Sequence, residues 1–296
     1  MTTHTLPDTI HSETNFSRLL ATAIRKETPC GPGKLVWRIW GHGGKPVVLL
    51  HGGSGSWAHW VRNIDPLVKA GYSVYAPDLP GFGESDIAPV DFDADGQADW
   101  VAQGIGQLLG TASYDLVGFS FGSMVATFIA VQCPARVSRL VVIGAPALTN
   151  VPGPRPHLHN WRGLGSAADR YQAHKHNLRS LMLAHDESVH DDIVTQYGRD
   201  AENDRIPQRR LFTTDIMRQI LPDVRCPVWG IWGAEDALYQ GCEATIVPAL
   251  SRAPLFQGLT RIPSAGHWVQ YEAAALFNRH LLAILDPDLH SGAKKN

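Results

Sequence analysis

Short runs of apolar residues recur along the chain, and most are followed by a turn and a longer stretch with helical spacing. These runs are rich in β-branched and aromatic residues and lack polar alternation, as is typical of strands covered on both faces. They are residues 46–53, 72–81, 114–120, 137–146 and 226–233. Residues 34–41 alternate more strongly, so we expect them to begin the sheet as an antiparallel edge strand. Alternating strands and helices predict an α/β protein with a mostly parallel sheet.

The alternation of strands and helices stops after about residue 148. Residues 149–222 carry amphipathic helix signals, such as AADRYQAHKHNLRSLML, but no strong strand. We therefore predict a first part of an α/β core at 1–148, a helical insertion at 149–222 and the second part of the core at 223–296. An insertion of this length between two strands of a sheet is expected to cover a site at their carboxyl ends.

The composition limits the classes of partner that we expect the chain to bind. Its 296 residues are 44% hydrophobic and 18% charged, which suits a globular protein with a sizeable core. A formal net charge of −2 argues against a nucleic-acid partner. No apolar run approaches the roughly 18–20 residues that span a bilayer, so no membrane partner is expected. The polar N-terminal stretch lacks an export signal, which favours a cytoplasmic location. A homodimer is compatible with the sequence.

Cysteines and histidines give no metal signature. The four cysteines are scattered without paired spacing, and six of the fourteen histidines lie between His157 and His190. His174 and His176 stand two apart, which on a helix points them to different faces. No matching carboxylate or cysteine pattern accompanies them, so the sequence predicts neither a metal site nor a cofactor.

One short motif carries candidate chemistry. Residues 118–122 read GFSFG, after an apolar strand and before a helix, which is where a nucleophile elbow belongs. A turn this sharp strains the backbone at Ser120, and side chains at positions 118 and 122 would collide, which explains the two glycines. Because a serine hydroxyl is a poor nucleophile, Ser120 needs a base to take its proton.

A histidine and a carboxylate with suitable positions follow later in the chain. His267 comes after a short candidate strand and before the last helix, whereas His280 falls within a helix pattern and is expected to be packed or solvated there. Glu235 and Asp236 directly follow a buried strand. We favour Asp236, which stands further beyond the strand end, and keep Glu235 as the fallback. The order serine, aspartate, histidine is the one expected of this architecture.

A glycine-rich loop supplies the last part of a catalytic site. The stretch HGGSG at 51–55 directly follows a strand, and the N–H groups of Gly53 and Phe121 are expected to bind a developing oxyanion. No G-K-[ST] or G-x-G-x-x-G motif is present, which disfavours a phosphate loop. We expect His51 to be structural.

Together these segments resemble the α/β-hydrolase superfamily from about residue 34 to 285. The matching pieces are HGGSGSW, DLPGFGES, GFSFG, WGAED and AGHWVQYE. The resemblance implies an eight-stranded sheet with strand 2 antiparallel and a helical lid between strands 6 and 7. Within the superfamily, GHWVQYE and the stretch LMLAHDESVHDDIVTQYGRDAEN are similar to the meta-cleavage-product hydrolases, which cut carbon–carbon bonds in ring-fission products. That likeness places Arg199 where those enzymes keep an arginine for a substrate carboxylate, with Arg205 as a nearby alternative.

The sequence therefore predicts a cofactor-independent serine hydrolase that acts on a small, largely apolar carbonyl compound. The carbon–carbon hydrolases usually carry asparagine before the nucleophile and this chain has Phe119, so ester cleavage stands level with carbon–carbon cleavage. A receptor-like binding protein and a cofactor-free haloperoxidase-like enzyme on the same fold are further alternatives. The candidates to line the substrate pocket are Trp161, Tyr171, Met182, Tyr197 and Trp268.

Overall fold

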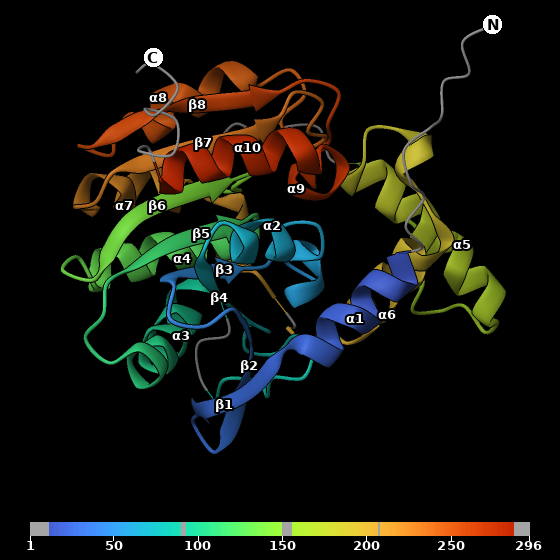
Figure 1. The fold of residues 1–296 in the computed structure, drawn as a ribbon. Helices are drawn as coiled ribbons and strands as arrows, with labels where there is room; N and C mark the ends of the chain where they lie inside the picture. The colour runs from blue at the N-terminus through green and yellow to red at the C-terminus, as the bar shows by residue number, and fades with distance from the viewer. Residues whose placement is uncertain (1–11, 90–92, 150–155, 207, 287–296) are drawn as a thin grey trace, which may run out of the picture.

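The computed structural model describes residues 12–89, 93–149, 156–206 and 208–286, and a sheet of eight strands forms its centre (Figure 1). The strand order is β1-β2-β4-β3-β5-β6-β7-β8. β2 is antiparallel to both of its neighbours, whereas β3 to β8 are parallel, so the predicted α/β class and the antiparallel second strand are confirmed. The strands are β1 (Ile24–Cys30), β2 (Gly33–Trp40), β3 (Lys45–Leu50), β4 (Tyr72–Pro77), β5 (Tyr114–Phe119), β6 (Val137–Ile143), β7 (Val228–Gly233) and β8 (Phe256–Ile262).

The hydrophobic pattern missed the first strand of the sheet. We expected the edge strand at residues 34–41, but β1 precedes it and pairs along its whole length with β2. β1 reads IRKETPC. Its first four positions are exposed or only partly buried, and the fifth, Thr28, is buried. An edge strand with a solvated face needs no apolar run, which is why the pattern did not reveal it.

Helices cover both faces of the sheet. Side chains of α3, α4, α7 and α8 join one buried cluster with the sheet, and those of α1, α2, α9 and α10 join another. Figure 1 shows α2, α9 and α10 in front of the strands. The helices are α1 (Ser12–Thr22), α2 (Ile64–Lys69), α3 (Ala94–Leu109), α4 (Phe121–Gln132), α7 (Ile216–Ile220), α8 (Ile246–Leu250), α9 (Val269–Glu272) and α10 (Ala274–Leu285). Short 3₁₀ helices span Trp57–Trp60, Asp186–Ser188, Arg210–Thr213, Leu221–Asp223 and Glu243–Thr245.

The chain between β6 and β7 is helical. It contains α5 (Ala167–Asn177), a π-helical turn (Leu178–Met182), α6 (Asp191–Glu202) and α7. Figure 1 shows α5 and α6 standing beside the sheet, and we call residues 156–206 the lid segment. Apolar residues of this segment join the cluster that also contains α1 and α10. The exact boundaries at 149 and 222 stay predictions. Among the described residues, no helix is long and apolar enough to cross a membrane.

Candidate active site

Ser120 occupies a strained turn between β5 and α4. Its backbone has φ 50° and ψ −118°, in the left-handed region that residues with a side chain rarely adopt. A Cβ atom on Gly118 would lie 2.4 Å from the carbonyl oxygen of Gly122, and one on Gly122 would lie 2.4 Å from the carbonyl oxygens of Leu50 and His51. The steric reason given for the two glycines is therefore confirmed. The turn presents Ser120 at the N-terminal, positive end of α4.

The loops after β7 and β8 bring a carboxylate and an imidazole together. The Nδ1 atom of His267 lies 2.9 Å from Oδ2 of Asp236, and both side chains are buried. The other carboxylate oxygen of Asp236 accepts the backbone N–H of Leu238 at 2.9 Å. Because an ionised carboxylate only accepts, Nδ1 carries the proton and Nε2 keeps its lone pair.

The neighbouring acid lies elsewhere. The side chain of Glu235 is 47% exposed, and its carboxylate lies 3.8 Å from the imidazole of His185 in the lid segment. Asp236, and not the fallback Glu235, is thus the acid in contact with His267.

Close packing fixes the His267 ring. A Cβ atom on Gly144, which has φ 51°, would lie 3.0 Å from two atoms of this ring. The ring of Phe119 packs on another side, with 5.0 Å between ring centroids. Phe119 also lies within 3.0 Å of a Cβ placed on Gly52. The residue before Ser120 is thus a buried wall between the histidine and the glycine loop.

Two buried histidines hold the glycine loop. The Nε2 atom of His51 accepts the N–H of Leu79 at 2.8 Å, while its Nδ1 lies 2.7 Å from the carbonyl oxygen of Gly52. The Nδ1 atom of His59 accepts the N–H of Gly52 at 3.1 Å. Burial lowers the pKa of His51 and lowers that of His59 well below its usual value, so both rings are neutral at pH 7. The structural role expected for His51 is confirmed, and His59 is a second support that the motif did not indicate.

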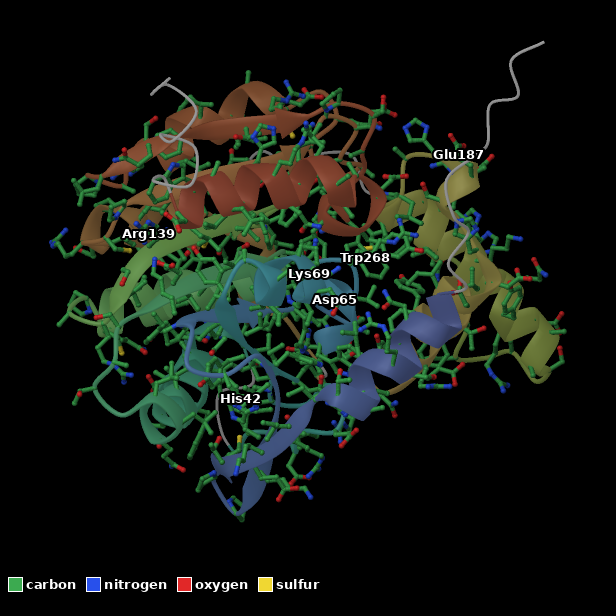
Figure 2. The ribbon with its side chains drawn as sticks, in the orientation of Figure 1. His42, Asp65, Lys69, Arg139, Glu187 and Trp268 are labelled. Carbon is green, nitrogen blue, oxygen red and sulfur yellow. The ribbon has the colours of Figure 1, made fainter. Side chains whose placement is uncertain are left out.

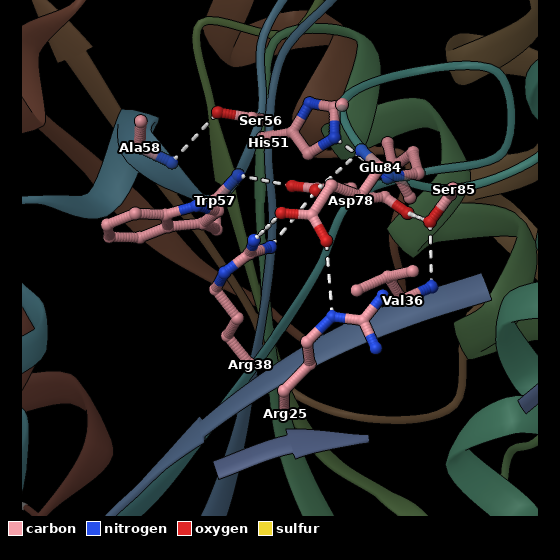
Figure 3. Close-up of polar contacts among 12 residues, drawn as sticks. Arg25, Val36, Arg38, His51, Ser56, Trp57, Ala58, Asp78, Glu84 and Ser85 are labelled. Carbon is pink, nitrogen blue, oxygen red and sulfur yellow. Dashed lines mark hydrogen bonds and ion pairs between the residues drawn. The ribbon is translucent and has the colours of Figure 1, made fainter. Parts of the chain in front are cut away.

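An acidic residue ties this loop to the turn after β4 (Figure 3). The carboxylate of Asp78 accepts the N–H groups of Trp57 and Glu84, each at 3.0 Å, and the guanidinium of Arg38 at 3.1 Å. Arg38 also pairs with Glu84. Asp78 and Arg38 are both buried, so water does not solvate their charges, and each charge is compensated by the other. The result is a rigid base under the glycine loop.

A cavity of about 420 Å³ joins the catalytic candidates to the lid segment. Ser120 and His267 both line it, as do Gly53 and Phe121. Phe121 is the first residue of α4, so its N–H has no acceptor within the helix. Of the five aromatic and methionine residues expected in the pocket, Trp161, Met182 and Tyr197 line the cavity, whereas Tyr171 and Trp268 do not.

The position of Trp268 corrects the expectation that it binds substrate. Its side chain is 1% exposed, and its indole N–H donates to the carbonyl oxygen of His59 at 2.9 Å. Its ring stacks on Tyr271 at 4.6 Å between centroids. Figure 2 shows Trp268 where the sheet domain meets the lid segment. Trp268 thus packs behind His59.

The position of Arg199 requires a second correction. Arg199 lies in α6, where Tyr197 and Ala201 line the cavity, but its own side chain is exposed and is not part of the lining. A residue two positions from each of these two lies on the other side of a helix with 3.6 residues per turn. The alternative Arg205 binds the carbonyl oxygens of Gly83 and Ser85.

Two arginines line the cavity, the exposed Arg162 and Arg209, and the sequence indicated neither. Arg209 is the one that lies over the glycine loop. Its Nη2 atom pairs with Asp204 and lies 3.4 Å from Oγ of Ser54. Its buried Nε has no hydrogen-bond partner in the described part of the chain. The guanidinium carbon lies 3.3 Å from a Cβ placed on Gly53. Arg209 lies in a stretch of the sequence without helix or strand spacing. Its place in the cavity lining is therefore seen only in the folded chain.

Comparisons with known proteins agree with this architecture. A model of the α/β-hydrolase fold family matches residues 45–274. A 2-hydroxy-6-oxononadienedioate/2-hydroxy-6-oxononatrienedioate hydrolase of Comamonas testosteroni is 29% identical over 82% of this chain and 88% of that protein. A 2-hydroxy-6-oxo-6-phenylhexa-2,4-dienoate hydrolase of Burkholderia cepacia is 28% identical, with the same coverage.

Solved structures support the fold. A meta-cleavage product hydrolase from Pseudomonas fluorescens has a TM-score of 0.67 and 24% identity, covering 88% of this chain and 97% of that chain. An esterase from Thermogutta terrifontis has a TM-score of 0.65 and 22% identity, covering 89% of this chain and 97% of that chain.

Proposed function

The chain belongs to the α/β-hydrolase fold family and is a hydrolase, and on that premise we propose that Ser120, His267 and Asp236 are its catalytic triad. The contact between His267 and Asp236, facing the same cavity as the strained Ser120, is the observation that carries this proposal. Asp236 orients the imidazole and stabilises its cationic form, while Nε2 acts on the serine hydroxyl.

In the proposed reaction, Oγ of Ser120 attacks the substrate carbonyl carbon as Nε2 of His267 takes the hydroxyl proton. The N–H groups of Gly53 and Phe121 hold the oxyanion. The tetrahedral intermediate expels an alcohol or an enolate carbon, which takes the proton from the imidazolium, and an acyl-enzyme remains. Water then attacks the acyl-enzyme, with His267 as its base, and releases the acid.

We propose a substrate that carries a carboxylate as well as the reacting carbonyl group. Arg209 supports this choice, because a guanidinium in the lining of the cavity favours an anionic group there. The names of the two relatives describe hydroxy-oxo dienoates, which are compounds of this class. Neutral esters are the second candidate, favoured by the apolar Phe119 before the nucleophile.

Turnover and labelling test the nucleophile. Ser120→Ala should lose turnover by about a million-fold if the triad acts as a unit. A fluorophosphonate probe should label the native protein at Ser120 alone. Labelling that persists in the alanine variant would remove the basis of the proposal.

A matched pair of variants tests the substrate class. Arg209→Gln should lower kcat/KM for a 2-hydroxy-6-oxo dienoate by about 2–4 kcal/mol, roughly 30- to 1000-fold, and leave an uncharged aryl ester nearly unchanged. Arg199→Gln, on the outer face of α6, is the control and should affect neither substrate. Equal losses of Arg209→Gln on both substrates would show a structural role, and turnover of the ester alone would favour the second candidate.

A homodimer and a cytoplasmic location stay expectations from the sequence. Light scattering coupled to size-exclusion chromatography tests the first, and fractionation of the source cells tests the second.

A further inference from the structure

Three histidines of the lid segment meet outside the catalytic constellation. His157 and His159 lie in the chain before α5, and His176 lies in the last turn of that helix. One ring nitrogen of each lies within 4.8 Å of those of the other two. The rings of His159 and His176 stack at 3.7 Å between centroids, with 7° between their planes.

Main-chain contacts hold these residues together. The side chain of Asn177 accepts the N–H of His159 at 2.7 Å and donates to its carbonyl oxygen at 2.9 Å. Asn177 is 5% exposed, so these two bonds are shielded from water. The Nε2 atom of His176 lies 2.9 Å from the carbonyl oxygen of His157. The segment that carries two of the rings is therefore tied to the helix that carries the third.

The contact between His176 and His157 also fixes a tautomer. A carbonyl oxygen only accepts, so Nε2 of His176 carries a proton, and the lone pair of the neutral ring is on Nδ1. Metal-binding histidines commonly donate their second ring N–H to a carbonyl or carboxylate in this way, which orients the ring. The backbone of the neighbouring segment thus supplies the supporting contact that a histidine ligand needs.

The kind of ion follows from the ligands. Three imidazoles suit Zn²⁺, Co²⁺, Ni²⁺ and Cu²⁺, whereas Mg²⁺ and Ca²⁺ prefer oxygen. Tetrahedral bonds of about 2.0–2.1 Å would bring the three nitrogens to about 3.4 Å from one another. His157 and His159 are exposed, so their side chains can rotate to close this distance without moving the core. Rotation of His159 breaks its stack on His176, because two parallel rings cannot direct their in-plane lone pairs at one ion.

We propose that the lid segment binds one divalent transition-metal ion through His157, His159 and His176. Three protein ligands leave the fourth position of a tetrahedral ion for water. His159 also lines the catalytic cavity, together with its neighbours Leu158 and Trp161. Bound metal therefore fixes a wall of that cavity to α5. The site is separate from the triad, so the proposal stands or fails independently of the catalytic mechanism.

Cobalt titration of the full-length, untagged protein tests the site. Co²⁺ should saturate at one equivalent and give the visible absorption bands of a tetrahedral nitrogen-ligated ion, and Zn²⁺ should displace it. His157→Gln and His176→Gln should each weaken binding at least tenfold. His42→Gln is the control, because His42 is an exposed histidine in the turn between β2 and β3, away from the lid segment (Figure 2). It should change the affinity less than twofold.

Thermal unfolding separates lost ligands from lost structure. Without metal, both lid variants should unfold cooperatively, and the exposed His157→Gln should melt within about 2 °C of the native protein, because surface substitutions change stability little. Added Zn²⁺ should raise the melting temperature of the native protein and not of the variants, since an ion that binds only the folded chain stabilises it. Absence of saturation near one equivalent, or a loss of affinity no greater than for His42→Gln, would overturn the proposal. So would an equal rise in melting temperature in all variants.

Discussion

A buried carboxylate at the joint between the lid segment and the core makes stability depend on pH. Asp200 in α6 is 6% exposed, and its carboxylate accepts the hydroxyl of Ser56 and the amide of Gln196, each at 3.0 Å. Burial raises its pKa from 3.8 to about 7, nearby Asp78 adds to the increase, and the two hydrogen bonds and the charge of Arg199 oppose it. At neutral pH this carboxyl group is therefore about half protonated in the folded protein, whereas it is ionised in the unfolded chain.

The size and sign of the effect follow from this pKa. Because the folded pKa of Asp200 lies above the unfolded one, its contribution to the free energy of unfolding is largest at low pH, falls as the pH rises from about 4 to 7, and is constant above that. At about 1.4 kcal/mol for each pKa unit, ionised Asp200 costs up to about 4 kcal/mol at pH 8. Asp200→Asn removes that charge. Its amide oxygen still accepts from Gln196, and its N–H can donate to the hydroxyl of Ser56.

Thermal unfolding at two pH values checks the argument. At pH 8, Asp200→Asn should raise the melting temperature by up to about 8 °C, at about 2 °C for each kcal/mol in a chain of this size. At pH 5, where ionisation of Asp200 still costs about 1.6 kcal/mol, the difference should shrink to about 3 °C. Asp223→Asn, which replaces a carboxylate that is 64% exposed, should change neither value. A variant that is less stable than the native protein at pH 8 would show that the charged form of Asp200 is the preferred one.

Three further substitutions test the supports of the site. Asp236→Asn should lower kcat by about 10⁴-fold, because it favours the wrong tautomer of His267. Glu235→Gln should change kcat less than twofold. If steady-state kinetics rank the two variants in the reverse order, the roles of the two acids must be exchanged. Glu272→Gln should lower the melting temperature by the equivalent of about 1.5–3 kcal/mol, because that carboxylate accepts three backbone N–H groups from the lid segment and the histidine loop, whereas the exposed Glu187→Gln should leave it unchanged. Gly122→Ala should prevent soluble expression, because its Cβ would lie 2.4 Å from two carbonyl oxygens. Gly163→Ala is the control, because no atom lies within 4 Å of a Cβ at that position. A normal yield and melting temperature of Gly122→Ala would refute this steric account.

The core of the site could be predicted because its signals are local and repeated. Each of the segments around Ser120, Asp236 and Gly53 directly follows an apolar strand, and parallel strands place their carboxyl ends on one edge of the sheet. Backbone strain at the serine requires neighbouring glycines that are readable in the sequence. The edge strand β1 could not be predicted in the same way, because four of its seven positions are exposed and it has no apolar run.

The supports of the glycine loop show where sequence reasoning reaches its limit. His59 belongs to a short 3₁₀ helix and contacts Gly52 through a ring nitrogen, a relation that no spacing rule predicts. The same holds for Glu272, whose carboxylate accepts N–H groups from two residues that lie 88 and 87 positions away. Contacts of this kind depend on how loops cross in space.

The choice of Arg199 as a pocket residue was wrong for a related physical reason. Its inner face is set by the rotation of α6, and a rotation of half a turn exchanges the cavity-lining Tyr197 for Arg199. The cations in the cavity lining are instead Arg162 and Arg209. Arg209 lies outside any long helix, where an ion pair with Asp204 fixes it. Asp204 is also held beside Ser54, whose Oγ lies 2.5 Å from Oδ2 of Asp204. Without this carboxylate, the guanidinium of Arg209 next to the proposed oxyanion site would bind any anion tightly, including the product. The pair with Asp204 partly neutralises Arg209. Under the proposed function, this lowers the net positive charge that a carboxylate product has to leave.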